Sequence, residues 1–577
     1  MKKIIGLFFL GSSLLFAQQP DLKTPFEKGN GNQSATYKET MNYYQTLDKS
    51  FETIAVKTMG STDNGEPLHI VTFNPEKIFD FKVINTQNKA VMLINNGIHP
   101  GETDGIDATM LFMKDLATGK IAVPKNTIVV AIPVYNVGGA MNRNSTSRAN
   151  QNGPEAYGFR GNSRNFDLNR DFIKSDTRNS RSFQVIFNIV NPDVFIDNHV
   201  SNGADYQYTL TYIDTHYQKL GGNLGKFFNE QMMPSILKDM KAKKIEPVPY
   251  VNIHNDVPEK GFAKSMETPR FSTGYASMFN TLGVMVETHM LKKYSERVKV
   301  TYEYMLSTLN YTDKNAAEIK KQRQDNLVNY YPPGKYTVQW VIDSAQVKQI
   351  PFLGYEAKYK PSEVSGKPRL YYDRTKPFKK MIPFYEVYKP KKEITIPESY
   401  IVPKQYWEVI ELLRMNKIDM QPLKKDTILN VESYKIADYK TSKEAFEGHY
   451  GHYNTSVTAS RENVKFSEGD FVVKTSQKNV KYLLETLEPE ATDSFFNWNF
   501  FDTILQQKEY YSAYVFEDLA KQILDENPKL KAELEKKRQE DKKFAENGDA
   551  QLDWVYKHSK YYEKEHLQYP VYKVMRY

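Results

Sequence analysis

The sequence predicts an α/β fold for residues 50–325, because short apolar runs alternate there with amphipathic stretches. The clearest pair is the run Ala90–Asn95 followed by a helix-like stretch from Glu102 to Leu116. Three later apolar runs are further strand candidates: Thr127–Val134, Val194–Asp197 and Leu282–Val286. Strands that alternate with helices favour a sheet covered by helices over an all-α or an all-β fold.

A chain of 577 residues exceeds what one hydrophobic core normally serves, so more than one domain is expected. The composition changes near residue 330, where the breaker Tyr331-Pro332-Pro333-Gly334 precedes a stretch rich in Pro, Lys and Tyr. We therefore predict one domain over 18–329 and a C-terminal accessory region over 330–577. That region is expected to contain β-structure first and helices from about residue 503 to 568.

The first 17 residues are typical of a secretory signal peptide. Lys2 and Lys3 precede an apolar run from Ile4 to Phe16, and Ala17 is the small residue expected before cleavage. The run is too short to span a bilayer, and no later segment is long and apolar enough. The mature chain is therefore expected to be secreted or periplasmic, without a transmembrane segment. The formal net charge of +8 is spread along the chain and indicates no nucleic-acid partner.

The sequence contains no cysteine, which excludes a thiol nucleophile and a thiolate metal site. Histidine, aspartate and glutamate must therefore supply any metal ligands. Export without disulfides fits a bacterial periplasm or a secreted fluid, where a large core stabilises the fold unaided.

One candidate metal pair lies in the loop after the first strand candidate. His99 and Glu102 are separated by two residues, so one loop could direct an imidazole and a carboxylate at a single ion. Ligands of open α/β sheets gather at the carboxyl ends of the strands. Taken alone, however, the pair is more typical of an ordinary surface loop.

Two further strand candidates end in polar residues that would face the same edge. His199 follows the run Val194–Asp197, and Glu287 follows Leu282–Val286. His199 would complete the three protein ligands of a catalytic zinc site, although a lone histidine there is also compatible with packing. A glutamate buried at a strand end is costly unless it is paired or functional, and beside a metal-activated water it could take a proton.

The segment Asn165–Phe172 carries a cluster of charged and amide side chains. Arg170 can bind a carboxylate through two hydrogen bonds, and Asn169 can add a donor beside it. Asp167 could accept the free N–H of a metal-bound histidine and so fix the orientation of the ring. The alternative is a surface loop held by Asp–Arg pairs.

In this order the four segments resemble the M14, or carboxypeptidase A-like, zinc metallocarboxypeptidases. That family carries His-x-x-Glu, then Asp-x-Asn-Arg, then a distant ligand histidine and a catalytic glutamate after a hydrophobic strand. The matching positions are His99, Glu102, Asp167, Asn169, Arg170, His199 and Glu287. The resemblance covers about residues 50–320 and implies a mixed central sheet flanked by helices.

The resemblance also implies roles for the matched residues. One Zn²⁺ per chain would be bound by His99, Glu102 and His199. Glu287 would act as the general base, and Asp167 would orient a ligand histidine. Asn169 and Arg170 would bind the terminal carboxylate of a peptide or protein substrate, which makes the enzyme a carboxypeptidase.

Members of the family also use an arginine to stabilise the oxyanion and a mobile tyrosine to bind substrate. The segment 136–139 resembles the family's Asn-Pro-Asp-Gly, and counting on from it favours Arg148 for the arginine, with Arg143 as the alternate. Tyr275 is the candidate for the tyrosine, although it lies closer to Glu287 than the family's spacing.

Two alternative functions stay open. One is a carboxypeptidase or amidase acting on peptidoglycan stem peptides with the same metal chemistry, which D-residue or isopeptide substrates would distinguish. The other is a catalytically inactive protein that binds peptides or glycans on the same fold. The retained ligand types and Glu287 argue against the second alternative.

Overall fold

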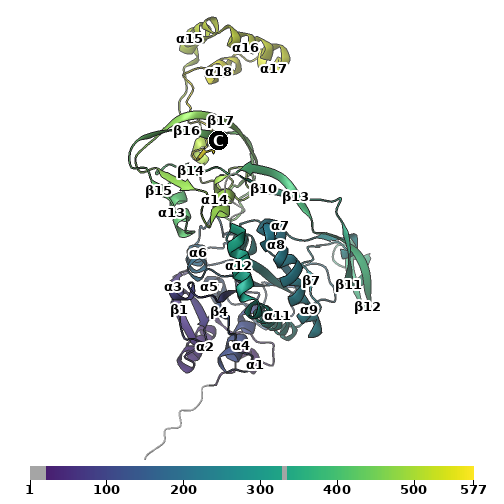
Figure 1. Ribbon diagram of the computed structural model, residues 1–577. Helices are drawn as coiled ribbons and strands as arrows, with labels where there is room; N and C mark the ends of the chain where they lie inside the picture. Colours follow the sequence, from purple (N-terminus) through teal and green to yellow (C-terminus); the bar gives the residue numbers. More distant parts are fainter. Residues whose placement is uncertain (1–20, 328–333, 577) are drawn as a thin grey trace, which may run out of the picture.

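The structure is a computed structural model that describes residues 21–327 and 334–576 (Figure 1). The expected signal peptide, residues 1–17, and most of the break at 331–334 lie outside the described residues. The domain boundary expected at 329/330 therefore stays a prediction. Among the described residues, no helix combines the length and the apolar character that crossing a membrane requires.

An eight-stranded mixed sheet flanked by helices confirms the predicted α/β class. Its strands are β1 Ile54–Ser61, β2 Pro67–Phe73, β3 Ala90–Asn96, β4 Thr127–Ile132, β5 Val194–Ser201, β6 Leu210–Asp214, β7 Val248–Pro249 and β9 Leu282–His289. They lie in the order β1-β2-β4-β3-β5-β9-β6-β7. The four central strands β4, β3, β5 and β9 are parallel, whereas β2 and β6 pair with them antiparallel.

Helices cover both faces of this sheet. One face packs against α2 Tyr37–Ser50, α4 Asp104–Ala117, α8 Gly222–Phe227, α9 Met233–Ala242, α11 Tyr294–Lys314 and α12 Ala316–Asn326. The other face packs against α3 Phe81–Ile84, α6 Arg178–Val190 and α10 Ser272–Ser277. Alternate side chains of β3 serve the two cores, Met92 on the first face and Leu93 on the second. Burial on both faces explains why the central strands are almost continuously apolar.

Two central strands extend beyond their predicted ends. The sequence indicated strands that stop at Asp197 and Val286, where the apolar runs end. In the structure β5 continues to Ser201 and β9 to His289, because the two strands stay paired through these polar residues. His199 and Glu287 therefore lie within the paired strands, directly opposite each other.

The C-terminal region contains β-structure followed by helices, as predicted. Strands β10 Lys335–Ile342 and β13 Tyr388–Thr395 pair with each other, and the hairpin β11 Lys348–Pro361 and β12 Pro368–Tyr385 joins β8 Phe262–Ala263. A six-stranded sheet has the order β15-β18-β14-β19-β16-β17. Its strands are β14 Ser399–Val402, β15 Gln421–Pro422, β16 Thr427–Thr441, β17 His452–Phe466, β18 Phe471–Lys474 and β19 Tyr572–Val574.

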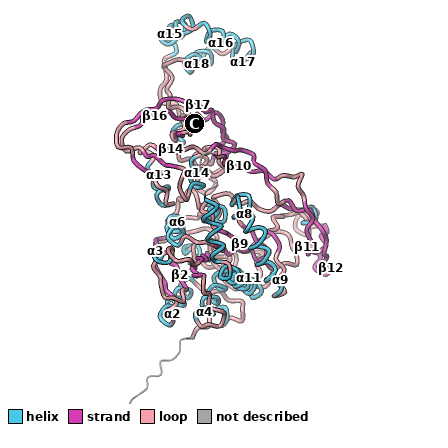
Figure 2. Tube along the Cα trace, in the orientation of Figure 1, coloured by secondary structure: helices cyan, strands magenta, loops and turns pink. Residues whose placement is uncertain are grey.

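Two groups of helices accompany this second sheet. The helices α13 Trp407–Met415 and α14 Val480–Leu487 lie between it and the first domain (Figure 2). A separate helical unit projects from the far end in Figure 1 and is built from α15 Ala513–Glu526, α16 Pro528–Glu540, α17 Lys542–Ala545 and α18 Gly548–Lys557. This unit has a small core of its own around Phe516 and Leu534.

The first domain and the C-terminal region share one hydrophobic core. Phe187 of α6 and Phe279 after α10 belong to the same buried cluster as Leu413 of α13 and Tyr482 of α14. The rings of Phe279 and Tyr482 lie 6.1 Å apart across the junction. The two parts are therefore joined by buried apolar surface and not by a linker alone.

Candidate active site

The carboxyl ends of β3, β5 and β9 meet at one edge of the sheet, because the three strands are parallel neighbours. β3 leads into the loop that carries His99 and Glu102. Gly97 allows this turn, since its φ of 66° lies in the left-handed region and a Cβ there would meet Ile106 at 3.2 Å. His199 comes from β5 and Glu287 from β9.

The structure brings His99, Glu102 and His199 together. Nδ1 of His99 lies 3.2 Å from Nδ1 of His199, and Nδ1 of His199 lies 3.1 Å from Oε2 of Glu102. One ligand atom from each of the three lies within 4.8 Å of the others, and all three residues are buried. No second group of this kind occurs among residues 21–327 and 334–576.

The donor set fits a zinc ion. Two imidazole nitrogens and one carboxylate are the ligands of many catalytic zinc sites, which keep a further position open. Burial alone would raise the pKa of Glu102, but the neighbouring His99, Arg148 and His199 hold it well below its usual range. The carboxylate therefore stays ionised, as a metal ligand must be.

Each histidine turns its other ring nitrogen to an aspartate. Nε2 of His99 lies 2.9 Å from Oδ1 of Asp167, and Nε2 of His199 lies 2.8 Å from Oδ2 of Asp197. Ser272 donates its Oγ hydrogen to Asp197. Such carboxylates fix the ring orientation and the tautomer, so that both Nδ1 atoms face the same point.

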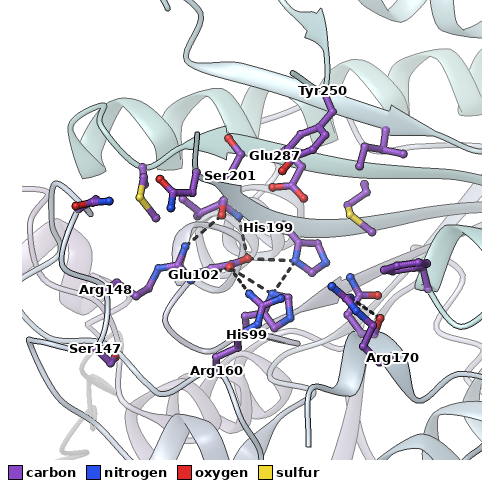
Figure 3. Close-up of a pocket in the computed structure, with 18 of the residues that line it drawn as sticks. His99, Glu102, Ser147, Arg148, Arg160, Arg170, His199, Ser201, Tyr250 and Glu287 are labelled. Atoms are coloured by element: carbon purple, nitrogen blue, oxygen red, sulfur yellow. Dashed lines mark hydrogen bonds and ion pairs between the residues drawn. The ribbon is translucent and has the colours of Figure 1, made fainter. Parts of the chain in front are cut away.

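A pocket of about 450 Å³ opens above this cluster (Figure 3). Its lining includes His99, Glu102, Ser147, Arg148, Asn150, Arg160, Asn169, Arg170, His199, Ile213, Tyr250, Glu267, Phe271, Met285 and Glu287. Six of the seven residues matched to the sequence motifs therefore line one pocket, and the seventh, Asp167, lies directly behind His99.

Glu287 lies beside the ligand cluster without belonging to it. It stands opposite His199 on the adjacent strand, and its side chain is 8% exposed. Burial raises the pKa of Glu287 to about 8, and the negative charges of Glu102 and Asp197 act in the same direction. A carboxylate with a raised pKa at the pocket wall is suited to proton transfer near neutral pH.

Asn169 and Arg170 lie in a short 3-10 turn, Leu168–Arg170, on one side of the pocket. The Oδ1 of Asn169 accepts a hydrogen bond from the backbone N–H of Ser272 at 3.2 Å, which leaves the amide nitrogen as the available donor. The guanidinium of Arg170 lies 4.5 Å from the centre of the Phe271 ring and donates to the backbone oxygen of Asn169. Both side chains are therefore held at the pocket wall, where they can bind an anion.

Three arginines of the loop region before Asp167 are candidates for the oxyanion role: Arg148, Arg143 and Arg160. Arg148 lines the pocket, but its guanidinium already donates to Gln151, to Glu102 at 2.8 Å and to the backbone of Val200. Arg143 does not line the pocket; it donates to Ser34 and Ala35.

Arg160 also lines the pocket, and its side chain is more exposed than that of Arg148. Its Nε and Nη2 donate to Oδ2 of Asp167, while Nη1 lies 3.6 Å from Oε1 of Glu102. The side chain is 45% exposed, compared with 13% for Arg148. In Figure 3 the Arg160 side chain lies next to His99.

The structure does not bring Tyr275 to the pocket. Its side chain is fully buried between Phe187 and Phe279, and its hydroxyl donates to Asn416 of the C-terminal region at 2.6 Å. The expected substrate contact is therefore corrected: Tyr275 lies on α10, on the face of the helix that packs into the core. Tyr250 lines the pocket instead and lies next to Glu287 (Figure 3).

Sequence reasoning missed four residues of the site: Asp197, Arg160, Tyr250 and Glu267. Asp197 could have been found, because it lies two residues before His199 on a strand and shares its face. Arg160 lies seven residues before Asp167 in an irregular loop that has no periodic pattern. Tyr250 and Glu267 also lie in loops, which reach the pocket only through the tertiary fold.

Comparisons with known proteins agree with these observations. Residues 40–222 match the family model described as zinc carboxypeptidase. Carboxypeptidase 2 of Trichophyton tonsurans and that of Trichophyton equinum are each 28% identical to this chain over 101 residues. The aligned part is 17% of this chain and 18% of each relative, so the chain spans less than a fifth of the relatives' length.

Solved structures of metallocarboxypeptidases are also similar to part of the chain. A metallo-carboxypeptidase from Burkholderia cenocepacia is 13% identical, with a TM-score of 0.36, over 49% of this chain and 70% of that one. The carboxypeptidase A from Helicoverpa armigera is 12% identical, with a TM-score of 0.37, over 49% of this chain and 74% of that one.

Proposed function

Because the chain belongs to the M14 zinc carboxypeptidase family, whose model matches residues 40–222, we propose that it removes C-terminal residues from peptides. The observation that carries this proposal is the convergence of His99, Glu102 and His199 beside Glu287 in one pocket. A zinc ion bound by the three ligands would supply a Lewis acid that polarises the scissile carbonyl and acidifies water. One zinc ion per chain is proposed.

Glu287 is proposed as the group that moves the proton. Its carboxylate accepts a proton from the attacking water and then delivers it to the leaving amine. Burial raises the pKa of Glu287, which makes its carboxylate a better proton acceptor. Tyr250, the neighbouring pocket tyrosine, is proposed to contact the substrate beside this glutamate.

Arg170 and Asn169 are proposed to bind the terminal carboxylate of the substrate. In Figure 3 Arg170 lies to one side of the ligand cluster, and the pocket that it lines also contains the three ligands. A peptide bound there by its terminal carboxylate is proposed to present its last peptide bond to the metal. Fixing the substrate at its terminus converts a bimolecular encounter into an oriented one. This contact distinguishes an exopeptidase from an endopeptidase.

Arg160 is proposed to stabilise the oxyanion in place of Arg148. Two of its nitrogens are fixed by Asp167, and Nη1 remains at the pocket side near Glu102. A preorganised donor at this position can meet the charge that develops on the carbonyl oxygen. Arg148, whose donors are already used by Gln151, Glu102 and Val200, is proposed to hold Glu102 in place.

Glu267 is proposed to make the pocket favour a cationic side chain on the residue that is removed. It lines the pocket near Arg170 and is the one acidic lining residue besides the ligand Glu102 and the base Glu287. Its carboxylate has no hydrogen bond to the part of the chain that the structure describes. A lysine or arginine side chain of the substrate would form an ion pair with that carboxylate.

The chain is also proposed to act outside the cytoplasm, since residues 1–17 have the pattern of a cleaved secretory signal. N-terminal sequencing of protein recovered from the periplasm or medium of an expressing cell would test this. A mature chain that begins after Ala17 is the expected result, and retention of Met1 in exported protein would contradict it.

Glu287→Gln tests the central proposal. Replacing the carboxylate by an amide keeps the size of the side chain and removes the base. Hydrolysis of a peptide with a free C-terminus should therefore fall by about 10²–10⁴-fold. The zinc content, measured by elemental analysis, should stay at one per chain. Glu296→Gln, which changes an exposed glutamate on α11, should leave both unchanged. Unchanged hydrolysis in Glu287→Gln would overturn the mechanism.

A further inference from the structure

The C-terminal region contacts two loops that position Asn169 and Arg170. The first loop is residues 166–176 and the second is residues 270–272. The first contact is made by the tip loop, which we define as residues 442–451 between β16 and β17. The second is made by Asp493 and Trp498 in the segment after α14. Neither contact lines the pocket, so both act through the loops that they hold.

Glu447 of the tip loop binds the backbone of Asp167. Its Oε2 accepts the Asp167 N–H at 2.8 Å, although the two residues are 280 positions apart. Asp167 in turn caps the 3-10 turn Leu168–Arg170, because its Oδ1 accepts the N–H of Asn169 at 2.9 Å. Glu447 therefore fixes the first residue of the turn that presents the Asn169 and Arg170 side chains.

The tip loop is shaped to make this contact. Glu447 has a φ of 50°, which is uncommon for a residue with a side chain, and Gly448 follows with a φ of 81°. Gly448 packs so closely on Phe166 that an added Cβ would lie 3.2 Å from the ring. His449 then bonds Oδ2 of Asp176 at 2.9 Å. Three successive residues thus contact the segment 166–176.

Asp493 holds the second loop. Its carboxylate, which is fully buried, accepts the backbone N–H of Arg270 at 2.9 Å and the Nε of the same residue at 2.7 Å. The guanidinium of Arg270 also lies over the ring of Trp498, 4.8 Å from its centre. Charge-assisted hydrogen bonds between an arginine and a carboxylate are strong and add geometric specificity.

The loop that Asp493 holds supports both substrate-binding side chains. Ser272 donates its backbone N–H to Asn169, and the ring of Phe271 lies under the guanidinium of Arg170. Displacement of residues 270–272 would therefore move both groups. The two contacts of the C-terminal region therefore act on the same pair, Asn169 and Arg170, through two different loops.

We propose that Glu447 and Asp493 are positioning residues through which the C-terminal region sets the carboxylate-binding geometry of Asn169 and Arg170. This inference rests on the proposed function, because it assigns the pair to the terminal carboxylate of a peptide. It makes the C-terminal region a part of the substrate site and not an independent appendage. The expected signature is a change in KM for peptides with a free C-terminus and little change in kcat.

Point variants of the full-length, zinc-loaded protein test the proposal. Glu447→Ala removes the acceptor for the Asp167 N–H and should raise KM for a free-carboxylate peptide about 10-fold, the factor given by ~1.4 kcal/mol. Glu447→Gln keeps an acceptor oxygen and should restore KM to within about twofold. Glu444→Ala, in the same loop and exposed, should match the wild type. Asp493→Asn keeps an oxygen acceptor but removes the negative charge that pairs with Arg270, so its KM should rise by an intermediate factor.

A second measurement keeps the test decisive if Glu447→Ala does not fold. Glu447→Asp retains the charge but shortens the reach by one methylene, and its KM should also rise. Inhibition by a dipeptide with a free carboxylate should weaken in parallel with KM, while the amide of that dipeptide should show no change between variants. Folded Glu447→Ala and Glu447→Asp variants with wild-type KM and inhibition would overturn the proposal.

The outcomes distinguish a failure of the positioning role from a failure of the proposed carboxypeptidase function. If wild-type enzyme is active and Arg170→Ala loses binding of free carboxylates, but the Glu447 and Asp493 variants do not, only the positioning role is wrong. If zinc-loaded wild-type enzyme hydrolyses no peptide and Arg170→Ala changes no binding, the proposed function itself is wrong.

Discussion

Asp167 lies 2.9 Å from Nε2 of His99, the ring nitrogen opposite the one that faces Glu102 and His199. Burial alone would raise the pKa of Asp167, but His99, Arg160 and Arg170 together hold it well below its usual range. The aspartate is therefore a permanent acceptor for the His99 ring. It also starts the turn that carries Asn169 and Arg170, so one residue links the proposed metal ligands to the proposed substrate-binding pair.

The first prediction concerns zinc affinity. Asp167→Asn and Asp197→Asn each replace an acceptor that orients a ligand histidine, so each should weaken zinc binding by about 10–100-fold. Competition with a chromophoric chelator would measure the change. Asp115→Asn, on α4 and bonded to Tyr302 and Lys120, is the matched control for a buried aspartate elsewhere. Equal affinity in all three variants would show that the aspartates do not support the metal site.

The second prediction separates Arg160 from Arg148. Arg160→Ala should lower kcat by about 10²–10³-fold with a small change in KM, as loss of an oxyanion donor does. Arg148→Ala should act mainly on zinc affinity, because its guanidinium donates to the ligand Glu102. Arg164→Ala, an exposed arginine in the same loop, is the control. The reverse assignment, with kcat lost in Arg148→Ala alone, would restore Arg148 to the oxyanion role.

The strand-end residues of the site could be predicted from the sequence for a physical reason. Buried parallel strands are continuous apolar runs, so the polar residues that follow them are conspicuous: His99 and Glu102 after β3, and His199 and Glu287 on β5 and β9. The parallel arrangement then forces these residues to one edge. The predicted α/β class and the approximate strand positions follow from the same pattern.

The loop residues could not be predicted in this way. The family resemblance suggests Tyr275 as the substrate-binding tyrosine, but α10 turns it into the core shared with the C-terminal region, where Asn416 accepts its hydroxyl hydrogen. Tyr250 reaches the pocket from a loop with no periodicity. The contact between Glu447 and Asp167 joins residues 280 positions apart, and no local pattern records such a pairing.

The third prediction concerns the terminal carboxylate. Arg170→Ala should raise KM for peptides with a free C-terminus by about 10–100-fold, since a charged hydrogen bond contributes ~1.5–3 kcal/mol. Peptides with an amidated C-terminus should be affected much less, because they offer no negative charge. Arg178→Ala, an exposed arginine at the start of α6, controls for a general loss of positive charge. An equal loss on both kinds of peptide would indicate that Arg170 supports folding.

The fourth prediction uses the titration of Glu267. Burial raises the pKa of this carboxyl to about 7, so in the free enzyme it is mostly neutral at pH 6 and mostly ionised at pH 8. A lysine side chain on the substrate stays protonated over this range. The ratio of kcat/KM for a peptide ending in lysine to that for one ending in leucine should therefore rise with pH, by about 10-fold if the ion pair adds ~1.4 kcal/mol.

The ratio of the two kcat/KM values separates the titration of Glu267 from that of the other groups nearby. Glu287, with a pKa of about 8, affects both peptides equally and cancels. Glu267→Gln should remove the rise and hold the ratio near its value at pH 6, whereas Glu230→Gln, an exposed glutamate, should leave the rise intact. A ratio that is independent of pH in the wild type, or a rise that persists in Glu267→Gln, would mean that another residue sets the side-chain preference.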